Sequence, residues 1–311
     1  MLGLLLVALL TDSMAVQVGS VTVIAPPERR GFAVALAEQA GRPVDWPGLG
    51  RRVPPPFTLV LAADSASLAR MTRGQMPGWG AGVTFPDARA IILRADLPDV
   101  AQTLRHELAH LVLRTSVHSR LPLWFDEGYA AWGSGEVGRA ETLELNFAVA
   151  AGKVPTFAEL DGMLRGSAGA ADLAYALAAS AVSELTRRQP PGGLERLLLR
   201  LEAGEDFGAA LTASTGLDPD RFEEAWQGAL RRRYSLLTWL VAGGMWTVIA
   251  FGLGGLAWYR KERDRPRRAA LDRDWVVPPP EEELADSVPP AGVGESPSPG
   301  GSPVDQRDPR Q

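Results

Sequence analysis

The first part of the chain alternates short apolar runs with turn residues, a pattern typical of strands. Val21–Ala25 and Phe57–Ala62 are apolar or β-branched segments bounded by prolines, and both are predicted to be strands. Between them, Gly31–Ala40 has the three- and four-residue apolar spacing of a helix. Ala88–Leu93 is a further strand candidate, preceded by a stretch rich in glycine and proline. This region is therefore expected to form a small sheet.

From Pro98 onward, the apolar positions follow a helical pattern. Val100, Leu104, Leu108 and Leu111 recur at three- and four-residue spacing, and proline is favoured in the first helical turn. Strands followed by helices indicate an α+β architecture. We expect a small mixed β-sheet followed by a mostly helical catalytic domain.

An apolar segment at the beginning of the chain indicates export. Residues 1–15 are predicted to be a signal peptide, with an apolar run from Leu2 to Leu10 and small residues at the two positions that a signal peptidase inspects. The basic residues that usually begin such a peptide are missing. The alternative interpretation is a buried strand at the start of the domain.

A second apolar segment indicates a single-pass anchor. The run from Leu236 to Trp258 has no charged residue, and as a helix it would be about 34 Å long, enough to span a bilayer. Residues 236–259 are therefore predicted to be a transmembrane helix, and the arginines that follow favour a cytoplasmic C-terminus. Residues 260–311, largely rich in Pro, Gly, Ser and acidic side chains, are expected to form a disordered cytoplasmic tail. The domain at 16–235 would then lie outside the cytoplasm, at the cell membrane.

Composition excludes several classes of function. The formal net charge of −5 carries no signature of nucleic-acid binding, so a nucleic-acid partner is not expected. The chain has no cysteine, which excludes disulfides, thiolate nucleophiles and cysteine-ligated zinc. Any metal ion must be held by histidines and carboxylates.

The segment from His106 to His110 carries the candidate chemistry. Two histidines four residues apart lie on one face of a helix, where both rings can reach one metal ion. Glu107, between them, is badly placed to be a ligand but can accept a proton from water bound to that ion. Two of the three histidines of the chain form this pair, so a coincidence on an exposed helix is the weaker interpretation.

A catalytic zinc ion needs a third protein ligand, and two residues are candidates. His118 follows His110 by eight residues, but the extended pattern that supplies a third histidine in metzincins has Leu113 and Ser116 at its defining positions. Glu127 lies on a second helix predicted from Pro122 to Gly133, among aromatic residues that indicate inward packing. Two histidines and a glutamate form a site with one open position, which favours Glu127.

These segments resemble the gluzincin clan of zinc metallopeptidases. His-Glu-Leu-Ala-His followed by Trp-Phe-Asp-Glu-Gly-Tyr-Ala is similar to the peptidase MA-like families and the aminopeptidase N-like enzymes. The resemblance implies that Glu127 is the third ligand of one Zn²⁺ ion. It also implies that Tyr175, within Asp172–Ser180, stabilises the oxyanion, although core packing is an equal alternative for this tyrosine. The likeness spans residues 20–230, but only the two ligand segments are specific.

Two departures from these relatives affect specificity. Aminopeptidases carry an acidic residue that holds the free amino terminus of the substrate, whereas Gly78–Phe85 contains no acid. Thermolysin-like enzymes have an acid four residues after the ligand glutamate, where this chain has Ala131. The first departure favours an endopeptidase.

The expected function is that of a membrane-anchored zinc peptidase acting on peptide or protein substrates, with Glu107 as general base. The predicted strand Ala88–Leu93 could be the sheet edge that pairs with extended substrate. Two alternatives remain open: a non-catalytic binding or assembly module with a structural zinc ion, and a zinc hydrolase of non-peptide amides. The presence of Glu107 favours catalysis, and only the family resemblance favours peptides over other amides.

Overall fold

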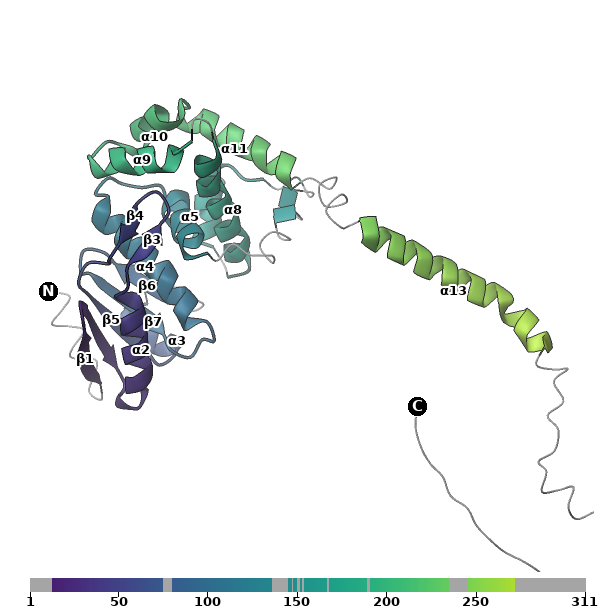
Figure 1. The fold of residues 1–311 in the computed structure, drawn as a ribbon, viewed down its shortest axis with the longest axis horizontal. Coiled ribbons are helices and arrows are strands. Elements are labelled where there is room, and N and C mark those ends of the chain that lie inside the picture. The colour runs from purple at the N-terminus through teal and green to yellow at the C-terminus, as the bar shows by residue number, and fades with distance from the viewer. Residues whose placement is uncertain are drawn as a thin grey trace, which may run out of the picture. The chain divides into compact units, whose positions relative to one another are not determined.

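The chain forms two compact units, residues 1–245 and 246–311, which are described separately (Figure 1). The structure, a computed structural model, describes residues 13–74, 80–135, 145–146, 148–149, 152, 154–166, 168–188, 191–234 and 245–271. The predicted signal peptide therefore lies outside the described residues up to residue 12. Its last two residues, Met14 and Ala15, begin a strand, and the signal peptide itself remains a prediction.

A five-stranded mixed sheet forms the first layer of the larger unit (Figure 1). Its strands are β1 (Met14–Val18), β2 (Val21–Ala25), β5 (Phe57–Ala62), β6 (Gly82–Phe85) and β7 (Ala90–Arg94). Their order is β1-β2-β5-β7-β6. The three inner strands are parallel, and β1 and β6 are antiparallel edge strands. A separate two-stranded sheet consists of β3 (Val44–Trp46) and β4 (Gly50–Arg52).

The expectation that Ala88–Leu93 forms an open sheet edge is wrong. The strand in this segment, β7, pairs with β5 on one side and with β6 on the other. The edge strand on this side of the sheet is β6, which lies in the glycine- and proline-rich stretch that was expected only to introduce the next strand. β7 is buried along most of its length because it is an inner strand, which explains its uninterrupted apolar sequence.

Helices make up most of the rest of the larger unit, as expected for the α+β class. They are η1 (Pro27–Arg29), α2 (Arg30–Ala40), α3 (Ser65–Met71), α4 (Val100–Ser116), α5 (Leu123–Ser134), α7 (Phe157–Leu164), α8 (Ala168–Arg187), α9 (Gly193–Glu202), α10 (Phe207–Thr215) and α11 (Pro219–Arg233). α4 packs against β6 and β7 on one side and against α5 on the other, and α5 packs against α8. One continuous hydrophobic core joins these layers. A smaller core of Val60, Ala62, Leu68 and Ile92 lies beside α3.

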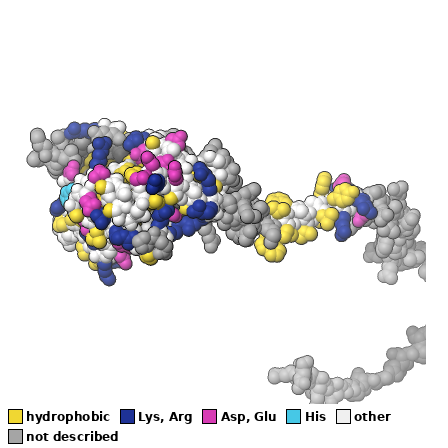
Figure 2. All heavy atoms as spheres, turned by 90° about the horizontal axis from the view of Figure 1, so that it is seen from above, with side chains coloured by type: hydrophobic (Ala, Val, Ile, Leu, Met, Phe, Trp, Pro, Cys, Tyr) yellow, Lys and Arg dark blue, Asp and Glu magenta, His cyan; other side chains and the backbone are white. Residues whose placement is uncertain are grey.

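Helix α13 (Met245–Leu271) belongs, from its second residue onward, to the C-terminal unit. The predicted membrane span, 236–259, begins outside the described residues, and no helix within the described part of the chain is both long and apolar enough to cross a bilayer. Exposed apolar side chains cover the beginning of α13, and charged side chains follow (Figure 2). The predicted disordered tail was expected to start at residue 260, but residues 260–271 are helical, with Arg265 paired to Glu262 at 2.7 Å. Residues 272–311 lie outside the described part.

Gly128 is required by the packing of α5 against α8. A Cβ atom at this position would lie 2.4 Å from the backbone oxygen of Ala178 and 2.6 Å from its carbonyl carbon. Backbone atoms in the middle of a helix cannot move away as a flexible side chain can. The glycine therefore sets how closely the two helices approach, and it directly follows Glu127.

We expect Gly128→Ala to lower the free energy of unfolding by about 1–3 kcal/mol, because the added methyl group forces the helices apart. Urea denaturation of the purified protein measures this change. Gly162→Ala is the matched control: Gly162 lies in α7, and a Cβ there meets nothing within 4 Å. This control should leave stability unchanged or raise it by up to about 1 kcal/mol. Equal stability of the two variants would contradict the packing role of Gly128.

Candidate metal centre

Helix α4 brings the side chains of His106, Glu107 and His110 together at one largely buried site. The side chains of His106 and His110 lie one turn apart, with ring centroids 4.9 Å from each other. His106 is 9% exposed and Glu107 is 6% exposed. The apolar residues of the same helix, including Leu104 and Leu108, face the core and hold this face in place.

Helix α5 adds Glu127 to the two histidines. Its Oε2 atom lies 3.6 Å from Nε2 of His106 and 3.3 Å from Nε2 of His110, and the two Nε2 atoms are 3.2 Å apart. Tetrahedral zinc bonds of about 2.0–2.1 Å place neighbouring ligand atoms about 3.3–3.4 Å apart. The three donor atoms thus have the spacing of three corners of a zinc tetrahedron, and the residues fit the ion that the sequence implies.

Glu107 stands beside this triangle and is held by the edge strand β6. The Thr84 hydroxyl donates to Oε2 of Glu107 at 2.7 Å and lies 2.9 Å from its backbone oxygen. Gly82 leaves space next to the carboxylate, because a Cβ atom there would lie 3.0 Å from both Cγ and Oε1 of Glu107. Burial raises the pKa of Glu107 above its ordinary value, although the histidine rings and the Thr84 hydroxyl act in the opposite direction.

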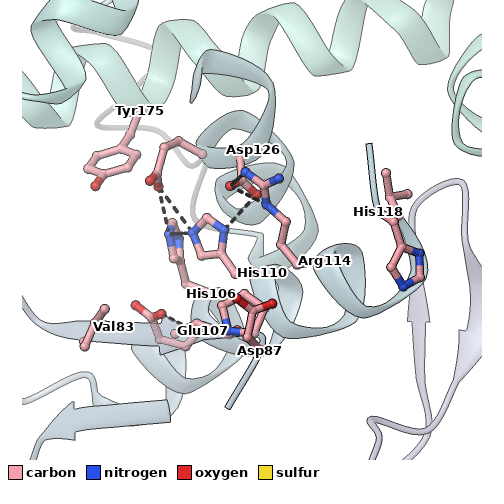
Figure 3. A pocket seen from close by; sticks show the side chains of 14 residues that line it. Val83, Asp87, His106, Glu107, His110, Arg114, His118, Asp126 and Tyr175 are labelled. Atoms are coloured by element: carbon pink, nitrogen blue, oxygen red, sulfur yellow. Dashed lines mark hydrogen bonds and ion pairs between the residues drawn. The ribbon is translucent and has the colours of Figure 1, made fainter. Parts of the chain in front are cut away.

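Asp126 contacts the ring of His110, a candidate ligand, and Arg114 in turn contacts Asp126 (Figure 3). Oδ1 of Asp126 lies 3.1 Å from Nδ1 of His110. Oδ2 accepts from Nε and Nη2 of Arg114, at 3.0 and 2.6 Å. When Nδ1 donates to this carboxylate, Nε2 keeps its lone pair and faces Glu127. Position 131, where the sequence resemblance led us to look for an acid, is an alanine, and Asp126 contacts the ring instead.

The charges of the cluster shift the pKa values of His110 and Glu127 in opposite directions. Burial lowers the pKa of His110, but the carboxylates of Glu127 and Asp126 outweigh burial and raise this pKa well above its ordinary value. Burial also opposes ionisation of Glu127, yet the two histidines hold its pKa well below the usual range. The site is thus rich in negative charge that favours a bound cation.

A cavity of about 540 Å³ opens onto these residues. Tyr175 of α8 lines it, with its ring centroid 5.8 Å from that of His106 and the two rings nearly perpendicular. His118 also lines the cavity but is not part of the His106, His110 and Glu127 group (Figure 3). Asp87, which follows β6 in the chain, is an exposed acid that also lines this cavity.

Comparison with known families agrees with this geometry. A family model described as "Peptidase MA superfamily" matches residues 50–232, which include every residue of the site described above. The chain belongs to the peptidase MA superfamily. No curated protein matches the chain. Membership in this superfamily confirms the predicted relationship to gluzincin-type metallopeptidases and makes the chain a peptidase-type hydrolase.

Four residues of the site were not predicted from the sequence: Gly82, Thr84, Arg114 and Asp126. The sequence pattern could have indicated two of them, Gly82 and Thr84. In Gly82-Val83-Thr84-Phe85, small or polar residues alternate with apolar ones, which is the period of a half-buried strand. Asp126 gave no such signal, because consecutive helical residues point in different directions and only the packing of α5 on α4 brings it to His110.

We expect Asp126→Asn to weaken zinc binding by about 10- to 100-fold, because an amide orients the ring and strengthens the ligand less well than a carboxylate. Competition with a chromophoric chelator measures the affinity. Asp96→Asn is the control, since Asp96 also pairs with an arginine, Arg94 at 2.9 Å, but outside the site. Similar zinc affinity in the two variants would contradict the supporting role of Asp126.

Proposed function

We propose that this member of the peptidase MA superfamily is a zinc-dependent endopeptidase. The observation that carries the proposal is the triangle of Nε2 atoms of His106 and His110 with Oε2 of Glu127, whose sides measure 3.2, 3.3 and 3.6 Å. Three protein ligands leave one coordination position open, as catalytic zinc sites do, whereas structural sites are closed by four. This feature favours catalysis over a purely structural zinc ion.

Glu107 is the proposed general base. A zinc ion held by the three ligands would supply a Lewis acid and lower the pKa of water. Glu107 takes the proton from the water that adds to the substrate carbonyl carbon, and the same proton passes to the nitrogen as the C–N bond breaks. Its raised pKa suits a group that both accepts and returns a proton. The hydrogen bond from Thr84 holds one carboxylate oxygen.

The edge strand β6 is the proposed site of substrate binding. Its outer side carries no strand partner within the described sheet, and it passes directly beside Glu107. An extended peptide can pair with such an edge through backbone hydrogen bonds. Tyr175, on the opposite wall, is the proposed donor to the oxyanion of the tetrahedral intermediate, because its ring lies next to His106 in the same cavity.

Endopeptidase specificity is supported by the lack of an acid in β6 itself. Gly82–Phe85 offers no carboxylate to hold a free amino terminus beside the cleaved bond. Asp87 is the nearest acid along the chain and supports an aminopeptidase as a second candidate, since it lines the cavity. Peptides with free and acetylated amino termini distinguish the two: an endopeptidase cleaves both, and an aminopeptidase cleaves only the free form.

Attachment to the cell membrane, with the catalytic domain outside the cytoplasm, is a separate part of the proposal. It is supported by the uncharged run Leu236–Trp258 and by exposed apolar residues of α13, such as Trp246 and Phe251. We expect the full chain to sediment with membranes and to need detergent for release. Deletion of residues 236–259 should make it soluble. Recovery of the full chain in the soluble fraction without detergent would contradict attachment.

The catalytic proposal is tested with Glu107→Gln and Tyr175→Phe in the full chain. Glu107→Gln should lower kcat by about a hundred- to ten-thousand-fold while zinc content stays stoichiometric, because the ligands are intact. Tyr175→Phe should lower kcat by about a hundred- to a thousand-fold with little change in KM, because an oxyanion donor acts mainly in the transition state. The measurements are elemental analysis and cleavage of an unfolded protein, with and without chelator.

The outcomes separate the competing functions. Chelator-sensitive cleavage by the wild type, lost in Glu107→Gln, supports the peptidase. Stoichiometric zinc without cleavage of any peptide would favour a binding module or a hydrolase of non-peptide amides. A folded wild-type protein that takes up no zinc would rule out the metal centre. Unchanged kcat in Tyr175→Phe would leave this tyrosine with core packing as its role.

A further inference from the structure

The edge strand β6 has two hydrogen-bonding sides, and its register on β7 shows which residues use each side. The two strands are antiparallel, with Gly82 opposite Leu93. The backbone N–H of Arg94 donates to the backbone oxygen of Ala81 at 2.9 Å. Since Ala81 precedes Gly82 and Arg94 follows Leu93, this bond extends the same ladder by one pair. Ala81 is therefore a position whose backbone bonds to β7.

The remaining residues of β6 follow from this position by alternation. Antiparallel strands alternate between hydrogen-bonded and non-hydrogen-bonded pairs. Because Ala81 bonds to β7, Val83 and Phe85 do so as well. Gly82 and Thr84 then direct their backbone N–H and C=O groups to the opposite side of β6.

A bond on the other side of β7 agrees with this assignment. The N–H of Ala95 donates to the backbone oxygen of Ala62 in β5, at 2.8 Å. Ala95 thus faces β5, so its neighbour Arg94 faces β6, as the bond to Ala81 requires. Beyond β6 the described sheet has no further strand. The backbone groups of Thr84 are therefore placed to pair with an added strand.

The side chain of Thr84 faces the proposed general base. Its hydroxyl donates to Oε2 of Glu107 at 2.7 Å and lies 2.9 Å from the backbone oxygen of the same residue. A hydroxyl has one proton to donate, and an ionised carboxylate is the stronger acceptor of the two. Threonine is β-branched, which restricts rotation of its side chain and keeps the hydroxyl in this direction.

We propose that Thr84 is a positioning residue that joins substrate binding to the general base. Its backbone N–H and C=O pair with the backbone of an extended peptide, with Gly82 as the second pairing position. Its hydroxyl holds Oε2 of Glu107, which leaves Oε1 to take the proton from the attacking water. The distance between the bound peptide and the base is then set within one residue. This inference rests on the proposed peptidase function.

The pairing is tested with an eight-residue peptide that the wild type cleaves at one bond. Each amide other than the cleaved one is N-methylated in turn, which removes a donor and blocks close approach to a strand edge. Because Gly82 and Thr84 are two residues apart, KM should rise about tenfold at alternate amides of the peptide. The amides between them carry the same methyl group and serve as controls with unchanged KM. An equal effect at every amide, or no effect, would overturn the pairing.

The role of the hydroxyl is tested with Thr84→Val, which keeps the shape of the side chain and the backbone groups. Its kcat should fall about 10- to 100-fold while KM stays unchanged, because a hydrogen bond to a charged group is lost. Thr84→Ser should restore most of kcat. Thr22→Val is the control, since the Thr22 hydroxyl also donates from a strand, to Oε1 of Gln17 at 2.6 Å, but outside the site.

A double variant shows whether Thr84 acts through Glu107. In Glu107→Gln the residual kcat should not fall further when Thr84→Val is added, because the group that the hydroxyl positions is already lost. A further fall as large as in the wild type, or an unchanged kcat in Thr84→Val alone, would overturn the positioning role.

Two measurements keep the proposals separate if the wild type cleaves nothing. The eight-residue peptide that binds Glu107→Gln most tightly is labelled and N-methylated in turn, and its Kd is read by fluorescence anisotropy. Alternation of Kd along the peptide supports the pairing without turnover, and its absence, or no binding, overturns it. Thr84→Val should also lower Tm more than Thr22→Val, because a buried carboxylate loses its donor. Equal Tm values in these two variants would overturn the contact with Glu107.

Discussion

The distance between α5 and α8 determines where Glu127, the proposed third ligand, lies. Gly128 packs directly onto the carbonyl group of Ala178, and any side chain there would push α5 away. Glu127 is its neighbour in sequence and lies on the side of α5 that faces the histidines of α4. A shift of about 1 Å would open the triangle of donor atoms beyond the ligand spacing of a tetrahedral zinc ion. The metal centre thus depends on helix packing, not on a loop that could adapt.

Burial makes the charge balance of this centre as important as its geometry. Glu107, Asp126 and Glu127 stand close together and are largely screened from water, and among the described residues the histidines and Arg114 oppose their charge. Burying a carboxylate without a compensating charge costs several kcal/mol. This cost is a large fraction of the free energy of unfolding of a whole domain. A divalent cation offsets this cost, so metal binding and folding are coupled in such a site. Arg114 neutralises Asp126, which leaves Glu127 for the proposed metal ion and Glu107 for the proposed general-base role.

The sequence predicted those parts of the fold that depend on local pattern. β2, β5 and the helices around the ligands follow from hydrophobic period and proline position, and the spacing of His106 and His110 follows from helical geometry alone. The third ligand required the family resemblance, because its distance from the histidines arises from packing between helices. β6 and its order in the sheet were missed, since its four-residue alternation is short, follows a stretch rich in glycine and proline, and gains its place in the sheet only from its partner β7.

The register of β6 on β7 determines which side chains of the sheet face the candidate site. Side chains alternate between the two faces of a strand. Gly82 and Thr84 face the carboxylate of Glu107, while Val83 and Phe85 pack with the smaller core beside α3. A shift of this register by one residue would place Val83 and Phe85 against the carboxylate. It would also turn Gly82 and Thr84 toward the smaller core. The apolar pair therefore fixes the register, and the register leaves room for the proposed general base and supplies its hydrogen bond.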